Sequence, residues 1–284
     1  MADHKGQSAK VGVKAMAAFI CTACGTEFAP SASPPVECPI CEEERQYIPP
    51  TGQSWTTLEA LRATRTNTFR QYEPCVIGIG TQPGFAIGQR AMLIVTPAGN
   101  VLWDCISLID EATVTLINGL GGLSAIAISH PHFYTTMNQW SRAFGGVPIY
   151  LHADDEEWIL QPSDAIVPWL GETLELLPDI TLIRCGGHFP GASVLHWSKG
   201  AGGRGLICSG DTVTVTPARN HLSFMRSYPN LIPLPAGAIR KIDAALKPFA
   251  FDAIYGHYFD RVVTTDAKAA MENSVARYLK AIED

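Results

Sequence analysis

Short apolar runs separated by turn residues make up most of the chain after residue 75. Three of these runs, 76–80, 91–95 and 101–104, follow one another closely, with glycine and proline in the segments between them. Apolar runs of this length, bounded by turn residues, are typical of buried strands. We therefore expect this region to begin with an antiparallel meander.

Further along the chain, the apolar pattern alternates between strands and helices. The run 123–130 predicts a strand, and Thr135 and Thr136 are suited to cap a helix that continues to Phe144. The acidic pair at 154–155 is suited to the N-terminus of a short helix. The last predicted helix is amphipathic, which indicates a face packed on a core. The pattern also predicts strands at 148–152, 174–177, 180–185, 193–197, 205–208 and 251–255, and helices at 55–63, 111–118, 236–246 and 265–282.

Four cysteines near the N-terminus form two Cys-X-X-Cys pairs. Cys21 and Cys24 make up the first pair, and thirteen residues separate it from Cys38 and Cys41. Two such pairs can place four thiolates on one ion, which predicts a tetrahedral metal site. A segment this small cannot bury a core of its own, so the ion would supply its folding free energy. Two disulfides are the alternative, and a reducing compartment disfavours them.

This segment resembles a zinc ribbon and, more loosely, a rubredoxin. Rubredoxin-like knuckles usually carry glycine after both pairs, whereas here Gly25 follows the first pair and Glu42 follows the second. The resemblance implies a structural zinc ion rather than iron, in a module at 18–52 that follows a disordered tail at 1–17. Four thiolates complete the coordination of zinc and leave no position for a substrate.

The composition of the chain limits the classes of binding partner and the cellular compartment that we expect. The net charge is −6 and no cluster of Lys and Arg is present, which argues against nucleic acid as a partner. No apolar run approaches the roughly 18 residues that span a bilayer, so no membrane association is expected. The remaining cysteines stand alone in apolar runs, as small buried hydrophobic residues do. We therefore expect a cytoplasmic protein.

Side chains of the kinds that bind metals follow three of the predicted strands. His130 and His132 end the first of these strands, and Asp211 and His257 come directly after two later ones. A further histidine, His188, lies in a turn rich in glycine, which lets the backbone bend sharply while the ring projects. The repetition of this pattern predicts that these side chains share one cleft.

The order of these motifs resembles that of the metallo-β-lactamase superfamily. The match runs from Val76 to the C-terminus and rests on His-X-His at 130–132, His-Phe-Pro-Gly-Ala-Ser at 188–193, Gly-Asp at 210–211 and Gly-His at 256–257. The resemblance implies an α+β fold, a four-layer αββα sandwich, in a domain spanning 53–284. It further implies that one metal ion is bound by His130, His132 and His188. Asp211 would then bridge toward a second position, where His257 would be a ligand.

One departure from the superfamily concerns that second position. The first motif usually reads His-X-His-X-Asp-His, and here Tyr134 and Thr135 occupy the last two places. Hydroxyl groups are poor ligands near neutral pH because they must first lose a proton. We therefore expect one zinc or iron ion in the histidine site, with Asp211 as a ligand or as the acceptor of a proton from water. Tyr134 would either donate a hydrogen bond to an oxyanion or fill the vacated space.

Two other histidines receive lesser roles. His196 lies in a predicted strand and is expected to pack rather than to bind metal. His221 begins the segment 221–228, which follows Asp211 at a place where the superfamily often has loops that cover the substrate. We expect this segment to form a wall of the pocket.

These residues support three hypotheses of function. The first is a hydrolase with one catalytic ion, whose metal-bound water attacks an ester, lactone, thioester, amide or phosphoester of a small molecule. The second is a non-catalytic metal-binding or assembly protein of the same fold. The third is a redox protein with a rubredoxin-like iron site, although this chain carries no flavin domain. Metal content and turnover separate the three. The sequence leaves the formation of a homo-oligomer open.

Overall fold

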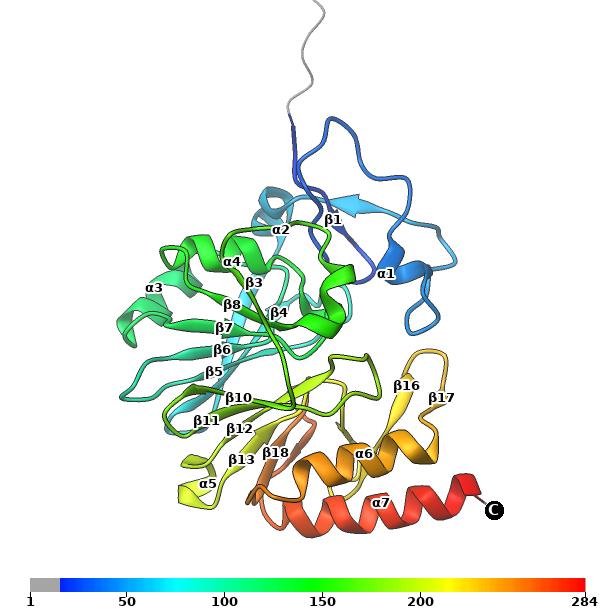
Figure 1. Ribbon diagram of the computed structural model, residues 1–284. Coiled ribbons are helices and arrows are strands. Elements are labelled where there is room, and N and C mark those ends of the chain that lie inside the picture. The colour runs from blue at the N-terminus through cyan, green and yellow to red at the C-terminus, as the bar shows by residue number, and fades with distance from the viewer. Residues whose placement is uncertain (1–15, 284) are drawn as a thin grey trace, which may run out of the picture.

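Two β-sheets packed face to face form the centre of the protein, as seen in a computed structural model that describes residues 16–283 (Figure 1). The first sheet is antiparallel over its first four strands and parallel over the rest, so the expected meander is confirmed. Its seven strands are, in spatial order, β3 (Thr66–Glu73), β4 (Val76–Gln82), β5 (Ala91–Ile94), β6 (Val101–Trp103), β7 (Ala125–Ala127), β8 (Ile149–His152) and β9 (Ile166–Trp169).

The second sheet has six strands and is antiparallel except where β13 runs parallel to β18. Its strands are, in spatial order, β10 (Thr173–Leu177), β11 (Ile180–Arg184), β12 (Ser193–Trp197), β13 (Leu206–Cys208), β18 (Ala253–Tyr255) and β19 (Val262–Val263).

Successive side chains along each central strand point into two different parts of the core, one between the two sheets and one between a sheet and its helices. In β5, Met92 and Ile94 face the opposite sheet, while Leu93 lies in the cluster formed with the outer helices. In β12, Leu195 faces the opposite sheet and Val194 lies against the other helix layer. Strands buried on both faces need apolar residues at every position, which is why their sequences are continuous apolar runs.

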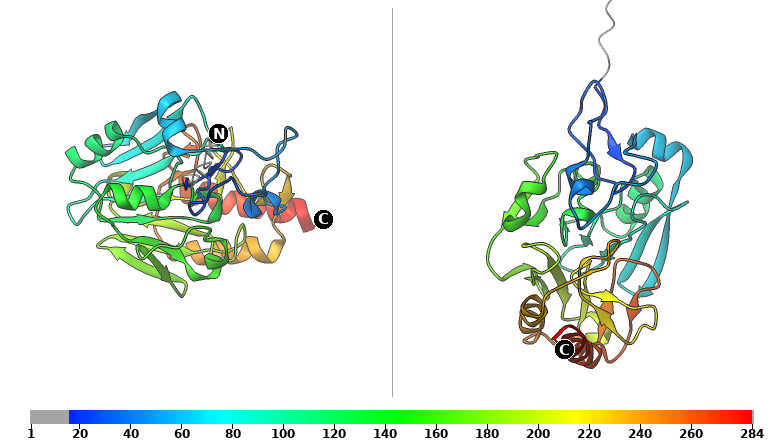
Figure 2. Two further views of the ribbon diagram at one scale, coloured as in Figure 1. Left: turned by 90° about the horizontal axis from the view of Figure 1, so that it is seen from above. Right: turned by 90° about the vertical axis from the view of Figure 1, so that its right-hand side faces the viewer.

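Helices cover the outer face of each sheet, and the expected four-layer αββα arrangement is confirmed. On the first sheet they are α3 (Glu111–Gly119) and α4 (Met137–Ala143), which bury Ile117 and Trp140. On the second sheet they are α6 (Ala236–Leu246) and α7 (Ala267–Glu283), which bury Ile242 and Met271. Figure 2 shows this second helix layer on the side of the sandwich away from the N-terminal module. No helix within 16–283 has the length and apolar character needed to cross a bilayer.

Some local predictions differ from the structure. The helix expected at 55–63 is α2 (Leu58–Thr64), which begins later because the Thr57 hydroxyl accepts a hydrogen bond from the Ala60 amide and caps it. Thr136 does not cap α4, since its hydroxyl donates to the Ser107 carbonyl. The apolar pattern does not predict β3, a half-exposed edge strand, because its sequence is mostly polar. The remaining elements are β14 (Thr214–Val215), β15 (Leu222–Ser223), β16 (Met225–Ser227), β17 (Ile232–Pro233), α5 (Gly200–Gly203), η1 (Pro131–Phe133) and η2 (Ala153–Trp158).

The N-terminal module, which carries the two Cys-X-X-Cys pairs, packs at one end of the sandwich. It contains β1 (Ile20–Cys21) and α1 (Pro39–Glu42), and β1 pairs with β2 (Trp55–Thr56). The small sheet thus joins residues on both sides of residue 52, and the domain boundary expected there stays a prediction. Of the tail expected at 1–17, only 16 and 17 lie within the described residues, and Ala17 pairs with Ser31 there.

Candidate metal centre

Four side chains of the kinds that bind metals converge at one end of the two sheets. His130 and His132 follow β7, Asp211 follows β13, and His188 lies in the loop between β11 and β12. One ligand atom from each of the four lies within 4.8 Å of those of the other three, and all four residues are buried. The structure thus brings together four of the five residues that the sequence assigned to this centre.

The distances within the cluster are those of groups that share one point. Nε2 of His130 lies 3.4 Å from Oδ2 of Asp211, and Nε2 of His188 lies 3.3 Å from Nδ1 of His132. Nε2 of His188 is also 3.7 Å from the same Asp211 oxygen. Nε2 of His130 is buried and has no hydrogen-bond partner among the described residues. A buried nitrogen without a partner is costly, and a metal ion at this point would remove that cost.

The second nitrogen of two rings is held by a neighbouring group. Nδ1 of His188 donates to the carbonyl oxygen of Met225 at 3.1 Å, which leaves the Nε2 lone pair directed into the cluster. Nδ1 of His130 lies 2.8 Å from Oγ of Ser129. Gly210 allows this contact, because a Cβ at its position would lie 2.4 Å from the Ser129 Oγ. Such partners fix the orientation and the tautomer of metal-binding imidazoles.

Burial keeps the three imidazoles neutral. It lowers the pKa of His130 to about 4 and also lowers the pKa of His132 and that of His188. Neutral imidazoles keep the lone pairs that a metal ion requires. Burial alone would raise the pKa of Asp211, but His257 and the hydrogen bonds of the cluster hold that pKa well below its usual range. The donor set is therefore three neutral nitrogens and one carboxylate, which suits zinc or iron.

His257 lies beside the carboxylate and is not one of the four converging residues. Its Nδ1 is 2.7 Å from Oδ1 of Asp211, on the opposite carboxylate oxygen from the one that faces the other histidines. Burial alone would lower the pKa of His257, but Asp211 raises it overall. The two residues are therefore a closely coupled buried pair, in which the carboxylate favours the protonated imidazole. A role for His257 as a metal ligand stays a prediction.

The Tyr134 hydroxyl bonds to a backbone carbonyl that is not part of the four converging groups. This hydroxyl donates to the carbonyl oxygen of Asp155 at 3.3 Å, the residue is only 2% exposed, and burial raises its pKa. Of the two roles considered for Tyr134, this geometry favours the filling of space. Its assignment as a catalytic residue stays a prediction.

Two buried carboxylates that the sequence analysis did not assign to the site support its loops. Oδ1 of Asp104 accepts a hydrogen bond from the Ser129 amide, and Oδ1 of Asp155 accepts one from the Gly191 amide, both at 2.7 Å. Burial raises the pKa of each carboxyl group to about 7. Asp154 and Asp155 lie in the first turn of the short helix η2, as the acidic pair predicts, although the side chain that caps this helix is that of His152. Asp104 could have been recognised, since it directly follows an apolar run.

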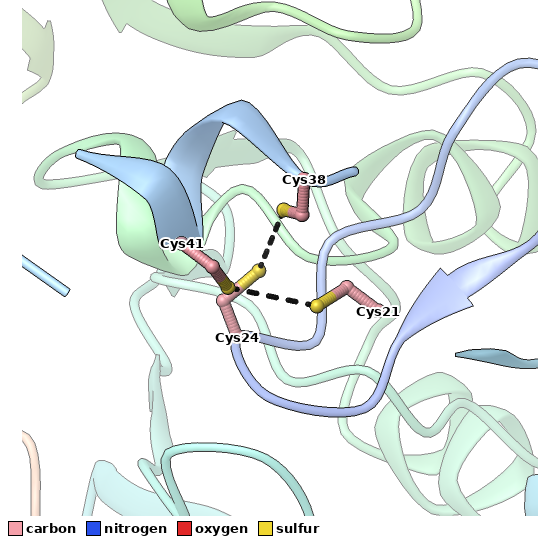
Figure 3. A group of neighbouring side chains, drawn as sticks. All are labelled: Cys21, Cys24, Cys38 and Cys41. Atoms are coloured by element: carbon pink, nitrogen blue, oxygen red, sulfur yellow. Dashed lines mark hydrogen bonds between the residues drawn. The ribbon is translucent and has the colours of Figure 1, made fainter. Parts of the chain in front are cut away.

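The four cysteines form a second candidate centre in the N-terminal module, drawn in Figure 3. The Sγ atoms of Cys21 and Cys41 are 3.6 Å apart, and those of Cys24 and Cys38 are 3.7 Å apart. Sulfurs bound to one tetrahedral zinc ion at about 2.3 Å would lie roughly 3.8 Å from each other, whereas a disulfide requires about 2.05 Å. All four cysteines are free. The geometry therefore fits one ion and contradicts the disulfide alternative.

The N-terminal module contacts the histidine centre through the segment that follows α1. Arg45 donates from Nε to the carbonyl oxygen of His188, and its guanidinium lies 4.3 Å from the ring centre of Phe189. Nε2 of Gln46 lies 3.4 Å from Nδ1 of His132. No local pattern in the sequence pointed to Arg45 or Gln46, because their role depends on docking between distant segments.

A pocket of about 590 Å³ adjoins the cluster. Asp211 and His257 line it, and Gln46 of the N-terminal module forms part of its wall. Ser223, Met225 and Tyr228 also line it, so the expectation for the segment 221–228 is confirmed at these three positions. His221 does not line the pocket and instead bonds to its neighbour Asn220. A larger groove of about 1080 Å³ between α6 and β11 contains none of the metal-binding residues.

Comparison with known proteins identifies one full-length relative and a shared fold. The chain is 49% identical over 266 residues to a Bacillus subtilis (strain 168) protein named "Uncharacterized protein YmaE", a match that covers 93% of this chain and 96% of that protein. No protein-family profile matches the sequence. The metallo-β-lactamase DIM-1 superposes with a TM-score of 0.57 at 14% identity, over 76% of this chain and 98% of that one. The metallo-β-lactamase FIM-1 from Pseudomonas aeruginosa, in its mono-zinc form, gives 0.55 at 12% identity, over 75% and 96%.

Proposed function

Because this chain belongs to the family of Bacillus subtilis YmaE and has the metallo-β-lactamase fold behind an N-terminal module with four clustered cysteines, we propose that it is a metal-dependent hydrolase. The observation that carries the proposal is the convergence of three neutral imidazoles and one carboxylate beside a pocket. The proposed substrate is an ester, lactone, thioester, amide or phosphoester of a small molecule. A pocket of about 590 Å³ is within the range of sites that hold small ligands.

The residues that would hold the catalytic ion are His130, His132 and His188, with Asp211 beside them. A zinc or iron ion there would act as a Lewis acid and would lower the pKa of a coordinated water to about 7. Three protein nitrogens leave at least one position open, as catalytic zinc sites require. The four cysteines would hold a second, structural zinc ion.

Asp211 and His257 supply the acid–base part of the proposal. Asp211 is held as a carboxylate, so it can accept a proton from the attacking water. His257 stabilises that carboxylate and keeps the Asp211 side chain in one orientation, because its Nδ1 lies 2.7 Å from Oδ1 of Asp211. Tyr228 fixes the same loop from the other side, because its hydroxyl lies 3.1 Å from the backbone carbonyl of Asp211.

Elemental analysis and a substrate panel test this proposal together. Protein purified without added metal or chelator is expected to contain about two zinc ions per chain, or one zinc and one iron in the histidine site. The panel consists of p-nitrophenyl esters, a γ-lactone, an acyl thioester, a chromogenic β-lactam and bis-p-nitrophenyl phosphate. His188→Ala and Asp211→Asn should abolish turnover of any substrate found. His221→Ala, a histidine in a loop outside the pocket, should not.

The alternatives predict different results. Two ions per chain with no turnover on the panel would favour a non-catalytic binding or assembly protein. Iron in the cysteine centre, recognised by its visible absorption, would favour a redox role. Zinc in the cysteine centre together with turnover lost in His188→Ala supports the hydrolase.

A further inference from the structure

Gln46 of the N-terminal module reaches the histidine cluster from outside the metallo-β-lactamase domain. Its Nε2 lies 3.4 Å from Nδ1 of His132, and the residue is 9% exposed. Gln46 also lines the pocket of about 590 Å³, together with Asp211 and His257. Its amide is therefore next to both the metal-binding atoms and the space available to a substrate.

The backbone around Gln46 is held on both sides. Its amide nitrogen donates to the Glu43 carbonyl at 2.9 Å, and its carbonyl accepts from Nδ2 of Asn230 at 2.9 Å. The adjacent residue Arg45 is anchored on the His188 carbonyl, and the Arg45 carbonyl accepts from the Ser227 hydroxyl. A side chain carried on a segment fixed in this way is oriented before any substrate arrives, which is the requirement for electrostatic catalysis.

The Gln46 side-chain amide would lose its hydrogen-bond acceptor if a metal ion were bound at the histidine centre. Nδ1 of His132 is 3.3 Å from Nε2 of His188 and 3.9 Å from Oδ2 of Asp211, among the atoms that face the common point. A nitrogen whose lone pair is used by a metal ion cannot also accept a hydrogen bond. The Gln46 amide would then line the pocket as a donor without an acceptor on the protein, which carries a free-energy cost. An oxygen of a bound substrate can remove that cost.

We infer that Gln46 is a catalytic residue that donates from its side-chain amide to the carbonyl oxygen of an acyl substrate, an inference that rests on the proposed function. In the attack, the water oxygen bonds to the acyl carbon, the π electrons of the C=O bond move to the carbonyl oxygen, and the water proton passes to Asp211. Gln46 stabilises the charge that develops on that oxygen. In the second step, an electron pair on that oxygen re-forms the C=O bond and the bond from the acyl carbon to the leaving group breaks. The electron pair of that bond leaves with the group, which takes the proton from Asp211, and the acyl carbon is released as a carboxylic acid.

Gln46→Met tests this inference, because methionine keeps the length of the side chain and removes the amide. Gln71→Met, an exposed glutamine on β3, is the matched control. The first readout is zinc per chain, which should stay at the wild-type value because Gln46 is not a ligand. The second is turnover of an acyl substrate, where kcat should fall about 10²–10³-fold, as for the loss of one oxyanion donor, with little change in KM.

The third readout needs no turnover. Acetohydroxamate, an oxygen ligand for metals, is titrated into the cobalt(II)-substituted protein and followed by its visible spectrum. Gln46→Met should bind acetohydroxamate about tenfold more weakly than the wild type, the loss expected when a hydrogen bond to a charged oxygen is removed. Gln46→Glu, which keeps the size of the side chain but has no amide hydrogens, should show the same loss. Gln71→Met should match the wild type.

Three results would overturn the inference. Loss of the ion from the histidine centre in Gln46→Met would show that Gln46 orients His132 instead. Unchanged kcat, or unchanged affinity for acetohydroxamate, would show that the amide does not contact the ligand oxygen. If the wild type turns over nothing on the panel, the proposed hydrolase fails, and the acetohydroxamate titration alone decides whether Gln46 is a donor.

Discussion

Arg45 of the N-terminal module donates a hydrogen bond to the carbonyl oxygen of His188, a residue 143 positions away in the chain. The guanidinium also pairs with Glu43 at 2.6 Å and lies over the ring of Phe189. The loop that carries His188 contains Gly186 and Gly187, both at positive φ, so its conformation depends on outside support. The module therefore supports the loop that carries His188, in addition to holding the four clustered cysteines.

Replacing Arg45 by Met should weaken metal binding at the histidine centre. Groups that orient metal ligands typically change affinity by about 10–100-fold when they are removed, and we expect a loss in this range. The cysteine centre should keep its ion. Competition with a chromogenic chelator measures both affinities. Arg62→Met is the control, because Arg62 makes a similar bond to the Ile109 carbonyl far from the site. An unchanged affinity in Arg45→Met would argue against this support of the loop.

A substitution in the histidine centre should leave the cysteine ion in place, whereas a substitution in the cysteine centre should weaken metal binding at both centres. His188→Ala should remove about one ion per chain and leave the cysteine ion in place. Cys41→Ser should remove the cysteine ion and also weaken the histidine centre, because the segment from Glu43 to Gln46 follows α1 directly. Cys75→Ser, outside both clusters, should keep both ions. Full occupancy of the histidine centre in Cys41→Ser would contradict this coupling.

Tyr134→Phe should distinguish a catalytic hydroxyl from a structural one. We expect unchanged turnover and a free energy of unfolding lower by about 1 kcal/mol, because the carbonyl of Asp155 loses its donor. Urea unfolding and steady-state kinetics provide the two measurements. Tyr150→Phe, on β8, serves as a control for the loss of a tyrosine hydroxyl elsewhere. A drop in kcat of tenfold or more in Tyr134→Phe alone would instead restore the catalytic role.

Titration of the Asp155 carboxyl group should lower the free energy of unfolding as the pH rises. Burial raises its folded pKa to about 7, above the value of about 3.9 in an unfolded chain. Between these values the folded state holds a proton that the unfolded state has released, so stability decreases with rising pH across this window. Asp155→Asn cannot titrate, and its stability relative to the wild type should therefore increase from about pH 4 to about pH 8.

Thermal unfolding of both proteins across this pH range measures the effect. Asp164→Asn, at an exposed position, controls for the removal of a carboxylate. The difference in melting temperature between Asp155→Asn and the wild type should change with pH. The corresponding difference for Asp164→Asn should stay nearly constant. Parallel pH curves for Asp155→Asn and the wild type would refute the assignment.

Much of the fold and most of the metal site could be predicted from the sequence. Strands buried on both faces require continuous apolar runs, so β5, β6, β12 and β13 were recognisable from local pattern alone. Candidate metal ligands that come soon after such runs, as His130 and Asp211 do, are expected to lie near strand ends. The spacing of the four cysteines likewise defined one tetrahedral site, since each knuckle is formed within a few residues.

Other features were decided only by the tertiary structure. Strand β3 lies at the edge of a sheet and is half exposed, so its sequence can be mostly polar. Its local pattern therefore does not predict a strand, and only its pairing with β4 defines one. Gln46 lies beside His132, and Asp155 supports the loop at Gly191, because distant segments dock. No local periodicity marks a residue for such a contact. The same holds for His257, whose sequence position predicts a ligand but whose ring lies on the far oxygen of Asp211. Local sequence determines the elements and the residues at their ends, whereas the contacts between elements depend on packing of the whole chain.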